Sequence, residues 1–272
     1  MKIAALQMVS TPRVGDNLQR ARELAAQAVS AGAELLVLPE YFCLMGLHDR
    51  DKLAHAEAEG SGPIQDTLAG IAREWSVWVV GGTLPLRIAG FADHAHNTSL
   101  VYGPDGRQVA RYDKIHLFRF DDGERRYDEA ATLRPGTASQ AFAARARDGG
   151  AWRVGLSICY DLRFPELYRS LMQPPCDLIA VPSAFTHATG LAHWELLLRA
   201  RAVENQCYVV ASAQGGRHEN GRRTFGHSMV IDPWGEVLGV QAEGDGVVVA
   251  EMQRGRLEQV RRQLPALGHR VL

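Results

Sequence analysis

The spacing of hydrophobic residues divides the chain into short apolar runs that alternate with amphipathic stretches. Three apolar runs in the first third are too short for helices and are typical of buried strands: residues 2–8, 35–38 and 77–84. Two stretches between them carry apolar residues at helical spacing: residues 18–30 and 64–75. Asp16 or Asn17 can cap the first of these helices, and Gly32 ends it. This third therefore predicts a β-α-β-α-β order, typical of a mainly parallel sheet covered by helices.

The second half of the chain repeats this rhythm. Strands are predicted at residues 152–158, 178–181, 208–213 and 247–250. Helices are predicted at residues 165–171 and 191–205, and a further helix follows the last strand. Turn signals at 103–106 and 232–235 each predict a hairpin. Two similar halves predict an α/β fold in which two sheets pack face to face with helices outside, while the strand order stays open.

Composition narrows the class of protein. The chain has 272 residues without a linker-like break, so we expect a single domain over residues 1–272. The 30 Lys and Arg balance 31 Asp and Glu without a basic tract, which argues against nucleic-acid binding. No apolar run approaches the roughly 20 residues that span a bilayer, so we expect no membrane insertion. The four cysteines form no Cys-x-x-Cys pair and the first residues resemble a strand, which favours a cytoplasmic protein with reduced thiols.

A thiol stands at the end of one predicted strand. The apolar run 152–158 stops at Cys159, because the next residues cannot continue it and a helix opens after Pro165. Ligands collect at strand ends in α/β sheets, and the first N–H groups of a helix can hold an oxyanion. Cys159 is therefore a candidate nucleophile, with the backbone N–H of Tyr160 as candidate oxyanion donor. An inert cysteine packed in the core is the simpler alternative.

A carboxylate and an ammonium stand at similar places. Glu40 follows Leu-Leu-Val-Leu-Pro, and these apolar surroundings should raise the pKa of its carboxyl toward that of a useful base. A solvated helix cap is the alternative. Lys114 follows the strand predicted at 108–112 and could point at a developing negative charge or reach outward to solvent. Because all three groups end predicted strands, a layered sheet could bring them together.

Three motifs carry a family resemblance: Leu-Pro-Glu40, Asp-Lys114-Ile-His-Leu-Phe and Ser-Ile-Cys159-Tyr-Asp-Leu-Arg-Phe-Pro-Glu. They resemble the catalytic motifs of the nitrilase superfamily of carbon-nitrogen hydrolases, and the likeness runs nearly end to end. The resemblance implies a four-layer α-β-β-α sandwich with Glu40, Lys114 and Cys159 as a catalytic triad, assembled as a homodimer or a larger homo-oligomer. Glu129 matches the second glutamate that the family places beside the triad, although a plain loop carboxylate is the alternative.

The later segments of the chain look most like the deaminated glutathione amidase branch of that superfamily. The resemblance implies a small amide substrate, deaminated glutathione, cleaved through a Cys159 thioester to 2-oxoglutarate and cysteinylglycine. One alternative is an omega-amidase acting on 2-oxoglutaramate or succinamate. Another is a non-catalytic interaction protein that keeps the fold. A lowered thiol pKa should make Cys159 alkylate faster than the other cysteines if the chain is an enzyme.

Weaker signals in the sequence concern substrate binding, a long loop and metal binding. Arg163, Phe185 and Thr186 are candidates for binding substrate, although Arg163 stands three residues before Glu166 and could pair with it instead. Residues 119–137 are rich in charge, glycine and proline, which predicts a long surface or active-site loop that could act as a lid. The ten histidines form no metal-binding motif, so we expect catalysis without a metal or cofactor.

Overall fold

The structure, a computed structural model, describes residues 1–121, 123 and 126–271. Its first part contains β1 (Lys2–Gln7), α1 (Val14–Ser30), β2 (Leu35–Val37), α2 (Asp51–Ala54), α3 (Pro63–Trp75), β3 (Trp78–Val80), β4 (Leu84–Ile88), β5 (Phe91–Tyr102) and β6 (Gln108–Asp113). The middle contains β7 (Arg119–Asp121), β8 (Arg126–Asp128), the 3-10 helix η1 (Glu129–Ala131), β9 (Gln140–Arg145), β10 (Ala151–Leu156), the 3-10 helix η2 (Cys159–Arg163) and α4 (Pro165–Ser170). The last part contains β11 (Leu178–Ser183), α5 (His187–Asn205), β12 (Tyr208–Ala213), β13 (Ser228–Ile231), β14 (Val237–Gln241), β15 (Gly246–Glu251), α6 (Arg254–Gln263) and the 3-10 helix η3 (Ala266–His269).

Two mixed sheets form the centre of the molecule. The first has seven strands in the order β15-β1-β2-β3-β5-β4, with β6 paired to β5, and the second has six in the order β14-β13-β12-β11-β10-β9. Neighbours are parallel in the middle of each sheet, at β1-β2-β3 and β10-β11-β12, and antiparallel toward the edges. The predicted α/β fold with two packed sheets is therefore confirmed.

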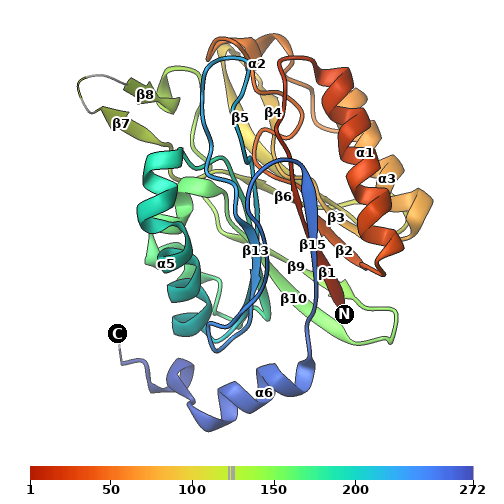
Figure 1. The fold of residues 1–272 in the computed structure, drawn as a ribbon, viewed down its shortest axis with the longest axis vertical. Helices are drawn as coiled ribbons and strands as arrows, with labels where there is room; N and C mark the ends of the chain where they lie inside the picture. The colour runs from red at the N-terminus through yellow and green to blue at the C-terminus, as the bar shows by residue number, and fades with distance from the viewer. Residues whose placement is uncertain (122, 124–125, 272) are drawn as a thin grey trace.

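The sheets and helices form four layers (Figure 1). Helices α1 and α3 cover the outer face of the first sheet, and α5 covers the outer face of the second. Along β1, Ile3 and Ala5 point into the core between the sheets, whereas Ala4 and Leu6 pack in the core beneath α1 and α3. Since both faces of the central strands are buried, their sequences are continuous apolar runs. No helix among the described residues is long and apolar enough to span a bilayer.

Several predicted boundaries were wrong. Helix α1 begins at Val14, four residues before the predicted start, because Asn17 does not cap it but binds the backbone of Thr11 and Cys43. The strand predicted at 77–84 ends at Val80 in β3, and Gly82 then adopts a φ of 53°. A Cβ atom at Gly82 would lie 2.2 Å from the carbonyl oxygen of Pro39, so only glycine permits this close approach beside the segment that carries Glu40.

The segment predicted as one long loop, residues 119–137, has structure of its own. Strands β7 and β8 pair as a hairpin, and η1 follows directly. Residues 122, 124 and 125 of this segment lie outside the described residues. The hairpin and α2 lie toward the upper end of the molecule in Figure 1.

Candidate active site

Cys159 occupies the turn between β10 and η2. The strand ends at Leu156, two residues before the predicted end, and Cys159 then adopts a left-handed φ of 47°, a conformation that non-glycine residues rarely take. The turn leaves Cys159 almost buried, with 8% of its surface exposed. The sulfur accepts a hydrogen bond from the backbone N–H of Ala184, and the thiol is hydrogen-bonded to the Glu40 carboxylate. The strained turn therefore presents the sulfur to a base.

Glu40 lies three residues after β2 and is almost fully buried. Its Oε1 accepts hydrogen bonds from the Lys114 ammonium and from the Asn97 side-chain amide, each at 2.9 Å. Its backbone carbonyl accepts a bond from Gln214 at the end of β12. The first sheet therefore holds the carboxylate of Glu40, and a residue that follows a strand of the second sheet holds its backbone.

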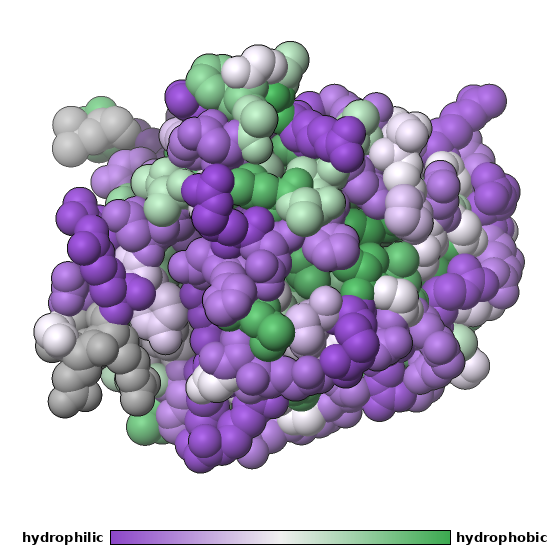
Figure 2. Space-filling model, turned by 90° about the horizontal axis from the view of Figure 1, so that it is seen from above, coloured by the Kyte–Doolittle hydropathy of each residue, from purple (hydrophilic) through white to green (hydrophobic). Residues whose placement is uncertain are grey.

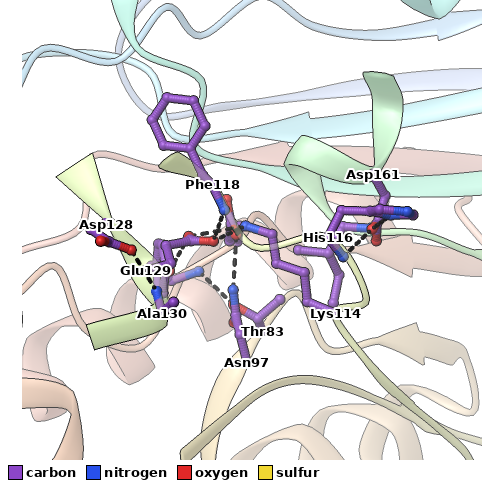
Figure 3. Close-up of polar contacts among 12 residues, drawn as sticks. Thr83, Asn97, Lys114, His116, Phe118, Asp128, Glu129, Ala130 and Asp161 are labelled. Carbon is purple, nitrogen blue, oxygen red and sulfur yellow. Dashed lines mark hydrogen bonds and ion pairs between the residues drawn. The ribbon is translucent and has the colours of Figure 1, made fainter. Parts of the chain in front are cut away.

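Lys114 is the residue after β6, and its side chain has no exposed surface. Its backbone N–H donates to the carbonyl of Asn97 at 2.9 Å, which fixes the start of the side chain. Figure 3 shows the chain running from this point toward Glu129. The ammonium lies 2.9 Å from Glu40 Oε1 and 2.8 Å from Glu129 Oε2, so one cation bridges two carboxylates.

Glu129 opens η1 and completes the cluster. Its carboxylate accepts bonds from the Lys114 ammonium, from the Tyr41 hydroxyl at 2.8 Å and from the backbone N–H of Phe118 at 2.7 Å. The structure thus brings together Glu40, Lys114, Glu129 and Cys159, which are far apart along the chain.

The two carboxylates have different proton affinities. Burial raises the pKa of Glu40, against the opposing charge of Lys114, as the sequence predicted. Burial also acts to raise the pKa of Glu129, but its bonds and charge interaction with Lys114 outweigh burial and lower that pKa. Burial acts to lower the pKa of Lys114, but the charges of Glu129 and Glu40 raise it overall. Glu129 is thus the ionised partner of Lys114, and Glu40 is the carboxylate that can hold a proton.

The pKa of the Cys159 thiol differs from the prediction. Burial and the neighbouring Glu40 charge raise the pKa of the thiol, although the Lys114 charge and the Ala184 N–H act in the other direction. A lowered pKa was predicted. The reason is that Lys114 is already shared between two carboxylates, so it does not compensate for the burial of a thiolate.

A cavity lies over this cluster, with an empty volume of roughly 770 Å³ that includes the solvent at its open mouth. Its lining includes Cys159, Glu40 and Glu129 together with the candidates Tyr160, Arg163, Phe185 and Thr186. Arg163 does not pair with Glu166; its guanidinium lies near His193 and over the rings of Tyr160 and Phe185. On the end of the molecule seen in Figure 2, hydrophobic residues gather among hydrophilic ones. The cavity thus places apolar and cationic side chains beside the cluster.

The residues that hold the cluster in place were not predicted from the sequence. Tyr41 and Asn97 bind the two carboxylates. Asp161, fully buried, accepts bonds from the Tyr112 hydroxyl, the backbone N–H of Ile158 and the side chain of His116. Apart from the bond between Ile158 and Asp161, which spans three residues, these contacts join distant parts of the chain, so no local pattern signals them. Among the described residues, no group of His, Cys, Asp and Glu could hold a metal ion.

A family model described as carbon-nitrogen hydrolase matches residues 2–262. The chain belongs to the carbon-nitrogen hydrolase family, within the nitrilase superfamily. This hydrolase is 45% identical over 270 residues to a deaminated glutathione amidase of Synechocystis, covering 98% of the chain and 97% of that relative. The crystal structure of the Caenorhabditis elegans NitFhit protein matches with a TM-score of 0.90 and 38% identity, covering 99% of this chain and 65% of that one.

A third relative is an amidase with a modified active site cysteine. An amidase from Nesterenkonia, in a glutamate-to-glutamine mutant, shows Michael addition of acrylamide at its active site cysteine. It matches with a TM-score of 0.79 and 28% identity over 97% of this chain and 98% of that one. These matches at TM-scores of 0.79 and 0.90 confirm the nitrilase fold predicted for this hydrolase.

Proposed function

We propose that this hydrolase is a thiol-dependent amidase that converts deaminated glutathione to 2-oxoglutarate and cysteinylglycine. The observation that carries the chemistry is the hydrogen bond between the Cys159 thiol and Glu40, beside an ammonium and inside a cavity. The likeness to the Synechocystis deaminated glutathione amidase supports the substrate.

The first step uses Glu40 as base. Glu40 accepts the Cys159 proton while the sulfur attacks the amide carbonyl, because the thiolate is the nucleophile. The raised pKa of Glu40 suits it to this task, since a carboxyl that binds protons more tightly is a better base. The carbonyl oxygen becomes an oxyanion, which the Lys114 ammonium and the backbone N–H of Tyr160 stabilise. Each well-aimed donor contributes on the order of 3 kcal/mol.

The second half of the reaction returns the proton. Protonated Glu40 donates to the leaving nitrogen as the carbon–nitrogen bond breaks, which releases the amine and leaves a thioester on Cys159. Glu40 then takes a proton from water, whose oxygen attacks the thioester. The carbon–sulfur bond breaks, the acid leaves, and Cys159 regains its proton. Glu129 stays ionised throughout and holds Lys114 in place, which its lowered pKa supports.

Substrate recognition requires cations, because deaminated glutathione carries a carboxylate on each side of its scissile amide. We assign Arg163 to the carboxylate of the 2-oxo acid half, with Phe185 and Thr186 on the same wall. Arg163 has no carboxylate partner among the described residues, so its charge is available to an anionic ligand. An omega-amidase would need only this first contact, because its substrate 2-oxoglutaramate loses ammonia.

Product identification tests the proposal. The purified protein is incubated with deaminated glutathione and with 2-oxoglutaramate, and the products are identified by mass spectrometry and an ammonia assay. We expect higher kcat/KM on the dipeptide amide, with release of cysteinylglycine. Preference for 2-oxoglutaramate would favour the omega-amidase, and the absence of any hydrolysis would favour a non-catalytic protein.

The Cys159→Ala variant tests the nucleophile. It should lose turnover by several orders of magnitude while keeping the thermal unfolding temperature of the wild type, because a small buried side chain that carries the reaction is removed without a backbone change. Cys43→Ala, which removes a buried thiol away from the cavity, is the matched control and should stay active. An active Cys159→Ala enzyme would refute the assignment.

We also propose a homodimer or larger homo-oligomer built through the outer face of α5. Large apolar side chains are exposed there and on the adjacent β13–β14 turn: Leu191, Leu196, Val203 and Trp234. Several large apolar side chains exposed on one helix and the turn beside it are typical of an interface. Light scattering of the wild type and of Leu196→Glu measures the mass; a monomeric wild type contradicts the proposal.

A reducing compartment suits this chemistry, and we infer a cytoplasmic location. All four cysteines are free thiols, and the nucleophile must be one. Fractionation of the native cells, followed by detection with an antibody, tests this.

A further inference from the structure

Lys52 is a second cation in the lining of the cavity, besides Arg163. Lys52 extends from α2, and its ammonium lies 5.7 Å from the centre of the Tyr41 ring. It donates one hydrogen bond, to the Thr132 hydroxyl at 3.3 Å. Tyr41 in turn binds Glu129, so Lys52 stands beside the carboxylate cluster.

Lys52 has no carboxylate partner within ion-pair distance among the described residues, whereas its charged neighbours do. Arg222 pairs with Asp49 at 3.1 Å, and Arg223 pairs with Glu243 at 2.9 Å. Lys114 is held by the two glutamates. The Lys52 side chain is partly buried. A partly buried ammonium without a counterion is costly, so its position in the lining of a binding cavity indicates an anionic ligand.

We propose that Lys52 binds the carboxylate at the far end of the amine half of the substrate, the C-terminal carboxylate of a dipeptide. The inference rests on the proposed amidase function and extends it. Glu40 must reach the leaving nitrogen to protonate it, so we place the amine half beside the two glutamates. Lys52 lies beside Tyr41, which binds Glu129. Arg163 contacts other residues of the lining, the rings of Tyr160 and Phe185.

The surroundings of Lys52 support this role. Burial lowers the pKa of its ammonium, and the charges of Glu129 and Asp49 offset this only in part. A bound carboxylate would favour the charged form, so ligand and lysine stabilise each other. A primary amide such as 2-oxoglutaramate offers no such carboxylate, because its amine half leaves as ammonia. Lys52 is therefore a specificity-determining residue that favours peptide amides over primary amides.

A matched pair of substrates isolates this contact. One is the 2-oxoglutaryl amide of cysteinylglycine, and the other is the same molecule with its C-terminal carboxylate converted to a carboxamide. For the wild type, kcat/KM should be about 10- to 100-fold higher with the free carboxylate, the range expected for a charged hydrogen bond. In Lys52→Met this ratio should fall toward one, and in Lys52→Arg it should be intermediate. Lys2→Met, which removes an exposed lysine at the start of β1, should keep the wild-type ratio.

The outcomes separate the inference from the function on which it rests. If the wild type hydrolyses both substrates with equal efficiency, or if Lys52→Met lowers both values by the same factor, the Lys52 inference is wrong and the amidase function stands. If neither peptide amide is hydrolysed while 2-oxoglutaramate is, the proposed substrate is wrong as well. Thermal unfolding shows whether Lys52→Met folds correctly. If it does not, the ratio of kcat/KM between the two substrates is taken from Lys52→Arg instead.

Discussion

Replacing Asp161 by asparagine should damage catalysis and stability together. Oδ1 of Asp161 accepts from the backbone N–H and the ring Nδ1 of His116, at 3.0 and 2.7 Å. Oδ2 accepts from the Tyr112 hydroxyl at 2.7 Å and the backbone N–H of Ile158 at 2.9 Å. Figure 3 shows Asp161 beside His116. One buried carboxylate thus joins the segment after β6, which carries Lys114, to the turn that carries Cys159.

The magnitude follows from these four contacts. Asparagine offers one oxygen and one amino group, so either orientation sets the amino group against a backbone N–H, of His116 or of Ile158. An unsatisfied buried donor costs about 1–3 kcal/mol, and the remaining bonds lose their charge assistance. We expect a loss of about 2–4 kcal/mol in the free energy of unfolding, which lowers Tm by about 5–15 °C. A shift of the Cys159 sulfur by about 1 Å from Lys114 would lower kcat by about 100-fold.

The assay measures Tm by differential scanning calorimetry and kcat with deaminated glutathione on the same preparation. Glu166→Gln is the control, because it removes an exposed carboxylate from α4 and should leave both values unchanged. An Asp161→Asn protein with wild-type Tm and kcat would refute the reasoning. A lower Tm with unchanged kcat would limit Asp161 to a role in stability.

Two further predictions concern the charge cluster. Glu129→Gln should lower kcat/KM by about 100- to 1,000-fold by loosening Lys114, and the acid limb of its pH profile should move to lower pH. The Glu129 charge contributes to the raised pKa of Glu40, so removing that charge lowers this pKa and keeps the basic form of Glu40 down to lower pH. An acid limb of the pH profile that does not move would contradict this interaction between the two carboxylates. Iodoacetamide should label Cys159 before the other three cysteines because Cys159 lines the cavity, with a rate that rises with pH. Peptide mapping measures this order, and equal labelling of the four thiols would contradict it.

The positions of the three candidate catalytic groups could be anticipated from the sequence for a physical reason. Strands buried on both faces are continuous apolar runs, so the point where each run stops is visible, and the polar residue that follows stands at a sheet edge. Glu40 and Cys159 follow strands of this kind. Lys114 follows β6, a partly exposed strand that the turn signal at 103–106 predicted as half of a hairpin. The family motifs then assigned their roles.

The supporting contacts could not be anticipated in the same way. Asp161 binds residues 45 and 49 positions away in sequence, His116 and Tyr112, and Tyr41 binds Glu129 across 88 positions. Such pairs depend on which strands become neighbours, and pattern alone left the strand order open. Lys52 shows the same limit, because a lysine in a short polar segment resembles any surface lysine until the cavity beside it is known.

The pKa values show which electrostatic effects a sequence can convey. Apolar neighbours in the sequence predicted the raised pKa of Glu40, because burial is the largest cause and burial can be inferred locally. The pKa of Cys159 was predicted with the wrong sign, because its sign depends on how the charge of Lys114 is divided in space. Two carboxylates share that one ammonium, so the cluster carries a net negative charge when both are ionised. A thiolate would add a second negative charge, and the sulfur therefore keeps its proton at rest. In the proposed mechanism the nucleophile is therefore activated by proton transfer to Glu40 during the attack on the substrate, so the pH dependence of the reaction should follow the carboxylate and not the thiol.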